Sequence, residues 1–286
     1  MTMTTANNQT RHQVHGKDFR GPVSTVIFDW AGTVLDFGCI APVAAFREAF
    51  AEEGLTISEA EARAPMGAAK REHIVLILAQ PDVSRRWQAE KGHTADAADV
   101  ERLYAAFLRI DAVNCARYSA LIPGALETIA HLRGQDIAIG STTGYPRSVM
   151  DGLMPLARMQ GYEPDHCVTV SDVNRGRPYP DMVLANAIAL GAPDVRACVV
   201  VDDSPTGLVS ARAAGMWAVG IIASGNEVGL SLADWLALDE AQQAARREAA
   251  RKTLDDAGAH FTIDTIADLT PVIAAINASL LAGGKP

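Results

Sequence analysis

The segment Ser24-Thr25-Val26-Ile27-Phe28-Asp29-Trp30-Ala31-Gly32-Thr33 contains the first clear pattern of this chain. The apolar run at 24–28 predicts a buried strand, and the carboxylate of Asp29 follows it directly, before a turn that contains Gly32. A carboxylate in that place is exposed at the strand end with backbone amides around it. Asp-x-x-Gly-Thr alone is a weak signal, and an aspartate that caps the following helix is the simpler alternative. The other predicted strands favour a functional interpretation.

Four more apolar runs predict strands, at residues 136–140, 166–170, 197–201 and 217–222, and an edge strand is expected at 260–263. Helical patterns separate them, which indicates an α/β fold with a doubly wound, Rossmann-like parallel sheet. Polar residues follow the first three of these runs: Ser141-Thr142-Thr143, Ser171-Asp172 and Asp202-Asp203. Because doubly wound sheets bind ligands at the carboxyl ends of their strands, these residues and Asp29 predict one shared site.

The residues between the first two predicted strands have a helical pattern. Helices are expected at 42–53, 68–80 and 96–115, with a capping box at Ser58 and Glu61 and a helix stop at Pro81. An insertion of this length is more than a crossover connection. We therefore expect a flexible tail (1–20), a core domain (21–37 and 121–286) and an inserted α-helical cap domain (38–120). Further helices are expected at 236–256 and 268–281.

The composition excludes several classes of protein. Of the 286 residues, 49% are hydrophobic and 21% charged, which is typical of a globular protein with a sizeable core. The net charge of −9 disfavours nucleic acid and anionic membranes as partners. The four cysteines have no metal-ligand spacing, which indicates free thiols in a reducing compartment. No run is long enough to span a bilayer and residues 1–20 lack the apolar segment of a signal peptide, so a cytoplasmic protein is expected.

Lys70 and His73 are three residues apart on a predicted cap helix, so their side chains share one face. Met66, Ile74 and Ile77 fall on the same face at helical spacing. Burial lowers the pKa of a lysine, and the neutral amine is a nucleophile. The alternative is a lysine whose head group reaches water from the edge of an apolar stripe. The pair is therefore a candidate for chemistry that residues elsewhere must support.

Three other groups suit a phosphoryl ligand. The segment Ser141-Thr142-Thr143-Gly144 offers hydroxyl and amide groups to an anion at a helix N-terminus. Arg177 supplies a fixed cation that can bind phosphoryl oxygens. Asp202-Asp203 provide the hard oxygen ligands that Mg²⁺ prefers, together with phosphate and water.

In this order, these groups and Asp29 resemble the haloacid dehalogenase superfamily of aspartate-nucleophile phosphotransferases. The resemblance implies that Asp29 attacks phosphorus and that Arg177 replaces the usual lysine of the third motif. Either Ser141 or Thr143 then makes the main phosphate contact.

The same resemblance implies a magnesium site. Mg²⁺ would lie between Asp29, the backbone carbonyl of Ala31 and Asp203. Asp202 is then either a fourth ligand or a residue that supports the ligands.

Ala31 departs from the pattern of that superfamily. Its phosphatases carry a second aspartate two residues after the nucleophile, which protonates the leaving oxygen, and this chain has alanine there. A leaving group that needs no proton on oxygen is expected, and carbon fits. Direct cleavage of a C–P bond would release an unstable carbanion, whereas an imine on the neighbouring carbon accepts those electrons and lets an enamine depart. Lys70 and Ala31 together therefore suggest a β-carbonyl phosphonate as substrate.

A closer resemblance is to the phosphonoacetaldehyde hydrolase (phosphonatase) family, and it extends from about residue 24 to residue 278. The matching stretches are Asp29–Thr33, Asp36–Cys39, Met66-Gly67 with Lys70 and His73, Gly140–Tyr145, and Ala257–Phe261. This resemblance implies hydrolysis of phosphonoacetaldehyde, a small-molecule phosphonate, to acetaldehyde and phosphate.

The resemblance also implies roles for individual residues. Lys70 forms a Schiff base with the aldehyde, and Asp29 takes the phosphoryl group as an aspartyl phosphate. His73 moves protons during imine formation, because its ordinary pKa suits both directions. The remaining candidates shape the pocket around the imine and bind the phosphonate: Cys39, Met66, Ser141, Thr143, Gly144, Tyr145 and Arg177.

Two alternative functions remain at this point. One is a generic capped, Mg²⁺-dependent phosphatase of the same superfamily, and the other is a catalytically silent phosphate-binding protein. A silent protein usually loses the nucleophile or the metal carboxylates, and both are present here. A homodimer that associates through the cap is expected, because closed dimers are the commonest oligomers of soluble enzymes and the family forms them.

Overall fold

The computed structural model describes residues 19–286, and its centre is a parallel sheet of six strands. The strands are β1 (Thr25–Phe28), β2 (Ala138–Thr143), β3 (His166–Thr169), β4 (Cys198–Asp202), β5 (Trp217–Ile221) and β6 (Phe261–Ile263). Their order is β3-β2-β1-β4-β5-β6, and each adjacent pair is parallel. The predicted doubly wound sheet is confirmed, including its edge strand.

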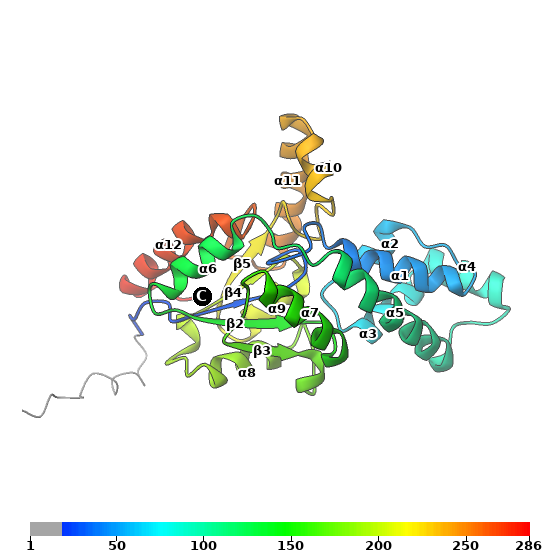
Figure 1. The fold of residues 1–286 in the computed structure, drawn as a ribbon, viewed down its shortest axis with the longest axis horizontal. Helices are drawn as coiled ribbons and strands as arrows, with labels where there is room; N and C mark the ends of the chain where they lie inside the picture. The colour runs from blue at the N-terminus through cyan, green and yellow to red at the C-terminus, as the bar shows by residue number, and fades with distance from the viewer. Residues whose placement is uncertain (1–18) are drawn as a thin grey trace, which may run out of the picture.

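Helices cover both faces of the sheet (Figure 1). Side chains of one face, such as Val199 and Val201, belong to a core cluster that includes apolar residues of α6 (Ala125–Arg133), α7 (Arg147–Met159) and α12 (Leu269–Leu281). Side chains of the other face, such as Cys198 and Val200, pack with α8 (Asp181–Ala189), α9 (Pro205–Ala213) and α11 (Glu240–Asp256). This alternation along β4 is the expected consequence of a strand buried on both faces.

The cap is a separate group of helices beside the carboxyl end of the sheet, on the right of Figure 1. It consists of α1 (Ile40–Glu52), α2 (Glu59–Arg63), α3 (Lys70–Ala79), α4 (Pro81–Lys91) and α5 (Ala97–Arg117). The two chain crossings between core and cap lie side by side, because Leu35 forms an antiparallel bridge with Leu121. The predicted capping box of α2 is present, with Ser58 and Glu61 exchanging hydrogen bonds.

Pro81 does not end the helical part of the cap. The predicted helix 68–80 stops there, but Pro81 is the first residue of α4. At that position a backbone N–H has no acceptor within the helix, so proline fits without the loss of a hydrogen bond.

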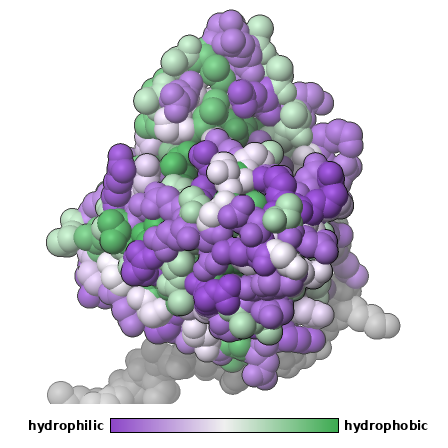
Figure 2. Space-filling view, turned by 90° about the vertical axis from the view of Figure 1, so that its right-hand side faces the viewer, coloured by the Kyte–Doolittle hydropathy of each residue, from purple (hydrophilic) through white to green (hydrophobic). Residues whose placement is uncertain are grey.

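The predicted helix 236–256 is two helices, α10 (Leu232–Ala237) and α11, which project from the core at the top of Figure 1. Asp239 ends the continuity because its side chain caps the start of α11. Figure 2 looks at the cap end, where hydrophilic residues dominate the surface and hydrophobic residues gather on the projection above it.

Other predicted elements begin or end at different residues in the structure. Strand β2 extends through Thr143, so the polar residues 141–143 lie within the strand instead of after it. Residues 1–18 of the predicted tail lie outside the described part of the chain. Phe19, which was assigned to the tail, is buried in the core, so the prediction is wrong at that residue. Among residues 19–286, no helix is long and apolar enough to cross a bilayer.

Candidate active site

Three buried aspartates meet at the carboxyl ends of two adjacent strands. Asp29 follows β1, Asp202 ends β4, and Asp203 is its neighbour, and one carboxylate oxygen of each lies within 4.8 Å of the others. The turn after β1 fits closely around them: Gly32 has a φ of +82°, and a Cβ there would lie 2.2 Å from Oδ2 of Asp203. Glycine is therefore required at that turn for both its conformation and its size.

Arg177 is the cation of this cluster. Its Nη2 donates to Oδ1 of Asp29 at 2.6 Å and to Oγ1 of Thr142 at 2.8 Å, and it lies 3.0 Å from Oδ2 of Asp202. Burial lowers the pKa of Arg177, but the carboxylates of Asp202 and Asp29 outweigh burial and raise it. The guanidinium therefore stays charged and is positioned to bind phosphoryl oxygens.

The carboxylates need more positive charge than Arg177 provides. Burial raises the pKa of Asp202 to about 6, against the effect of Arg177, and burial and the adjacent carboxylates raise the pKa of Asp203 strongly. Oδ2 of Asp202 accepts no hydrogen bond within residues 19–286, although Oδ1 accepts bonds from Ser204. A compact set of carboxylate oxygens with excess negative charge is the donor set that Mg²⁺ prefers, so the residues fit this ion.

The structure distinguishes between Ser141 and Thr143. Oγ of Ser141 accepts a hydrogen bond from Nε1 of Trp30 at 3.0 Å, and the residue is completely buried. Thr143 lines the pocket above Asp29, where its Oγ1 accepts a hydrogen bond from the backbone N–H of Tyr145 at 3.1 Å. Of these two hydroxyl groups, that of Thr143 belongs to the pocket lining and that of Ser141 is bonded to Trp30 outside it.

Core and cap together enclose a narrow pocket. Its lining residues come from both domains: Asp29, Ala31, Cys39, Met66, Gly67, Lys70, Thr143, Gly144, Tyr145, Arg177 and Asp203. Most of the predicted site residues are thus brought together. Gly67 lines the pocket without a predicted role. Three predicted site residues lie outside the lining: Ser141, Asp202 and His73.

Lys70 reaches the pocket from the first residue of α3 and is only 6% exposed. Its Nζ lies 4.7 Å from the ring centroid of Tyr145 and 5.7 Å from that of Phe46. Aromatic faces attract a cation and exclude water at the same time. This surrounding suits both an ammonium group and a Schiff-base cation.

The loop before α3 is pressed against the core. Gly67 has a φ of +88°, and a Cβ there would lie 2.1 Å from Oγ1 of Thr206 and 2.4 Å from Oγ of Ser204. Thr206 also donates to the carbonyl of Met66 at 3.4 Å. Only glycine allows this approach, which places Met66 and Lys70 over the strand ends.

Cys39 and Tyr145 are buried in the wall of the pocket. Burial raises the pKa of both groups strongly, so the thiol and the phenol are neutral. Cys39 adopts a left-handed conformation with φ of 53° immediately before α1, at the first crossing from core to cap. Both side chains therefore shape the pocket and carry no charge into it.

The expected ordinary pKa of His73 is wrong. Burial, with a contribution from Lys70, lowers it to about 3. Nε2 lies 2.8 Å from the carbonyl oxygen of Ala62 and therefore carries the hydrogen, while the ring packs on Phe46 with centroids 4.0 Å apart. Nδ1 has no hydrogen-bond partner in the described part of the chain. His73 is a neutral imidazole behind the pocket wall.

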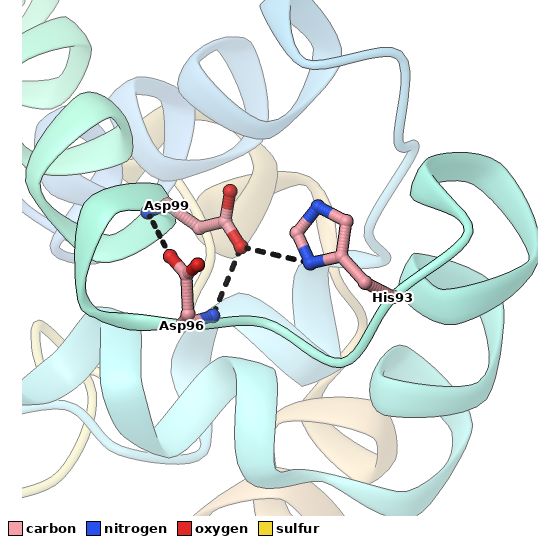
Figure 3. Close-up of side chains that lie close together, drawn as sticks. All are labelled: His93, Asp96 and Asp99. Atoms are coloured by element: carbon pink, nitrogen blue, oxygen red, sulfur yellow. Dashed lines mark hydrogen bonds and ion pairs between the residues drawn. The ribbon is translucent and has the colours of Figure 1, made fainter.

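A second group of potential metal ligands lies on the cap, at the start of α5 (Figure 3). Asp96 caps the helix through its side chain, Asp99 accepts a hydrogen bond from the backbone N–H of Asp96 at 2.9 Å, and His93 lies beside Asp99. Helix capping accounts for this arrangement without a metal.

Comparisons with known proteins agree with the geometry. Residues 23–215 match the family model of haloacid dehalogenase-like hydrolases. A phosphonoacetaldehyde hydrolase of Hahella chejuensis is 49% identical over 271 residues, which cover 94% of this chain and 91% of that protein. The enzyme of the same name from Vibrio cholerae is 46% identical and covers 93% and 98%. The chain belongs to the phosphonoacetaldehyde hydrolase family.

A solved structure has the same fold. The phosphonoacetaldehyde hydrolase-like protein from Oleispira antarctica superimposes with a TM-score of 0.93 at 42% identity and covers 100% of both chains. A hydrolase from Pseudomonas syringae, at 22% identity and a TM-score of 0.65, shares the fold. The family therefore includes both the sheet and the cap of this protein.

Proposed function

We propose that this protein hydrolyses the C–P bond of phosphonoacetaldehyde and releases acetaldehyde and phosphate. One observation carries the proposal: the amine of Lys70 from the cap and the carboxylate of Asp29 from the core line the same pocket. The names of the relatives in its family support the choice of substrate. The alanine at position 31 supports it independently, because the leaving group of this reaction is carbon.

The reaction begins on Lys70. The Lys70 ammonium group loses a proton before its amine attacks the aldehyde, and this proton is returned to the carbinolamine hydroxyl, which departs as water and leaves an iminium cation between the aromatic rings of Tyr145 and Phe46. His73 is neutral and its Nδ1 is free among the described residues, so it is suited to accept a hydrogen bond on the Lys70 side of the cap, while a pKa of about 3 makes it too weak a base to remove a proton from the amine. This role replaces the two-directional shuttle expected from an ordinary pKa.

Phosphoryl transfer follows at Asp29. The carboxylate forms a bond to phosphorus while the C–P electron pair moves into the iminium and produces an enamine. Water then cleaves the aspartyl phosphate, and the enamine is protonated and hydrolysed to acetaldehyde and free Lys70. No step protonates a leaving oxygen, which agrees with Ala31.

The phosphonate oxygens are held by residues of the core. Arg177 binds them through its guanidinium. At the carboxyl end of β2, Thr143 offers a hydroxyl and Gly144 a backbone amide. Asp29, Asp203 and the carbonyl of Ala31 would hold Mg²⁺, with Asp202 beside them. When bound, this ion offsets the negative charge of the carboxylates and the phosphoryl group.

The experiment that tests the function combines trapping with phosphate release. Purified protein is mixed with phosphonoacetaldehyde and Mg²⁺, borohydride is added, and the intact mass is read. We expect a reduced two-carbon adduct on Lys70 and phosphate release before trapping. The Lys70→Arg variant, which keeps the charge but cannot form the imine, should give no adduct and about 10⁴-fold less phosphate.

Other outcomes separate the parts of the mechanism. Phosphate release without a lysine adduct would contradict the Schiff base and leave a phosphatase that uses Asp29. The absence of both phosphate and adduct would contradict the proposed substrate. An exposed surface lysine, Lys252, provides the matched control, since Lys252→Arg should change neither signal.

We also propose a cytoplasmic homodimer. All four cysteines lie in the described part of the chain and are free, which supports a reducing compartment. Val113 on α5 and Leu76 on α3 are 69% and 41% exposed, which supports an interface on the cap. Light scattering should give twice the mass of one chain, and the mass of a single chain at working concentration would contradict the dimer.

A further inference from the structure

Arg63 is an arginine of the cap that bonds mainly to segments outside its own helix. It ends α2, and its side chain is only 12% exposed. Nη1 donates to the carbonyl of Gly38 at 2.9 Å, to that of Cys39 at 3.5 Å and to Oδ1 of Asn226 at 3.2 Å, and Nη2 donates to the carbonyl of Gly229 at 2.9 Å. One side chain thus joins the cap to the first crossing and to a loop of the core.

The core loop is shaped to receive this guanidinium. Gly229 has a φ of +66°, and a Cβ there would lie 2.7 Å from Nε and 2.8 Å from Cζ of Arg63. A side chain at position 229 would therefore displace the arginine. The guanidinium offers a rigid fork of donors to several carbonyl groups at once, which the point charge of a lysine cannot do.

Asn226 connects this contact to the acid cluster. Its side-chain oxygen accepts from Arg63, and its backbone N–H donates to Oδ2 of Asp203 at 2.7 Å. Asn226 therefore contacts the cap through Arg63 and also holds the carboxylate of Asp203 in the acid cluster. Both contacts move together if the loop moves.

Arg63 is also close in sequence to the cap side of the pocket. Its carbonyl accepts a hydrogen bond from the backbone N–H of Met66 at 2.9 Å, and Lys70 begins the next helix. The segment from Arg63 to Lys70 is thus held at its start by Arg63 and at Gly67 by Ser204 and Thr206 of the core.

We propose that Arg63 is a positioning residue that holds the cap on the core in the orientation in which Lys70 and Asp29 share one pocket. The inference rests on the proposed function, because that function requires both groups to act on one substrate. Arg63 lies outside the pocket lining and acts through the crossing at Gly38 and the loop at Asn226.

The first arm of the test measures catalysis. Arg63→Lys keeps the charge but loses the fork of donors, and we expect kcat for phosphate release to fall about 10- to 100-fold with a smaller change in KM, because a displacement of about 1 Å costs up to 10²-fold. Asn226→Ala removes the shared acceptor and keeps the backbone N–H to Asp203, so a smaller fall is expected. The double variant should be no slower than Arg63→Lys, because both changes break the same contact.

Two matched variants show whether a loss of activity comes from the contact between cap and core or from any change in the cap. Arg86 bonds to Glu61 and to the carbonyl of Thr56 within the cap, so Arg86→Lys should leave kcat within about twofold. Glu59→Gln removes the ion pair of Arg63 within α2 and leaves the bonds to the core, and it should also leave kcat unchanged. A loss in these controls equal to that of Arg63→Lys would contradict the proposal.

The second arm needs neither substrate nor metal. Hydrogen–deuterium exchange of the peptide around residues 225–231 should be faster in Arg63→Lys and Asn226→Ala than in the wild type, and unchanged in Arg86→Lys. Unchanged exchange, or a wild-type kcat in Arg63→Lys, would overturn the role of Arg63. Wild-type protein that releases no phosphate would instead contradict the proposed function. The exchange experiment would still test whether Arg63 holds the loop 225–231 in place.

Discussion

The guanidinium of Arg177 lies 2.6 Å from the carboxylate of Asp29 and is shared with Asp202, 3.0 Å away. One buried cation thus serves carboxylates at the ends of two adjacent strands, β1 and β4. Its removal would leave those carboxylates facing one another in a site that excludes water. This arrangement makes the site a source of instability that cations relieve.

We predict that Arg177→Met destabilises the protein by about 3–5 kcal/mol in EDTA, because it leaves buried carboxylates without a counter-charge. Millimolar Mg²⁺ should restore part of the loss. Chemical denaturation with and without Mg²⁺ measures both effects. Arg175→Met, which breaks an exposed ion pair with Asp181, is the control and should cost less than about 1 kcal/mol. Equal costs for the two variants would refute the prediction.

A second prediction concerns Ala31. The variant Ala31→Asp restores the acid that protonates a leaving oxygen, so hydrolysis of an alkyl phosphate ester should rise about 10²-fold, as general acids contribute 10²–10⁴-fold. Hydrolysis of p-nitrophenyl phosphate should rise less, since its leaving group needs no proton. Ala31→Asn is the matched control and should show neither gain. Equal rises for both esters would mean that Ala31 is not the position of the missing acid.

A third prediction concerns pH. The folded pKa of His73 is about 3, below the ordinary 6.5, so its contribution to stability is present above pH 6.5 and is lost as pH falls toward 3. At pH 5 the loss amounts to about 2 kcal/mol. The variant His73→Gln should lack this loss, whereas a variant of the exposed His131 should retain it. Denaturation curves between pH 8 and 4 test this, and parallel curves for wild type and His73→Gln would contradict it.

A fourth prediction concerns Asp111, a completely buried carboxylate on α5. Its Oδ1 has no hydrogen-bond partner among the described residues, and burial raises its pKa to about 6, against the effect of Lys70. A raised pKa means that stability is greatest below pH 3.8 and is lost as pH rises through 6. Relative to wild type, Asp111→Asn should therefore gain about 3 kcal/mol between pH 3 and pH 8.

The difference between wild type and Asp111→Asn at each pH is the quantity to measure, because the effect of His73 cancels in it. A difference that does not change with pH would show that Asp111 keeps its ordinary pKa. Asp234, which is exposed at the start of α10, offers the control variant Asp234→Asn.

Local patterns predicted much of the fold because they depend on few residues. The apolar runs before Asp29 and Asp202 are strands, and Ser58 and Glu61 form the expected capping box. The prediction at Pro81 is wrong, because a proline ends one helix or begins another according to its neighbours, and here it begins α4. The sequence pattern does not show the break at Asp239, because an aspartate inside a polar helical pattern gives no sign that it caps a new helix.

The sequence by itself determined which chemistry is proposed for this protein, because the aspartate at position 29, the alanine at position 31 and the lysine at position 70 are identities that folding does not change. Only the tertiary structure decided which groups line the pocket and what surrounds each of them. It turned Ser141 toward Trp30, left Thr143 at the pocket and made His73 neutral by burying it. It also assembled the contacts of Arg63 from two distant segments, at Gly38 and at the loop from Asn226 to Gly229. Burial and long-range contacts arise only when the chain is folded, so pKa values and shared hydrogen bonds lie beyond what residue order shows.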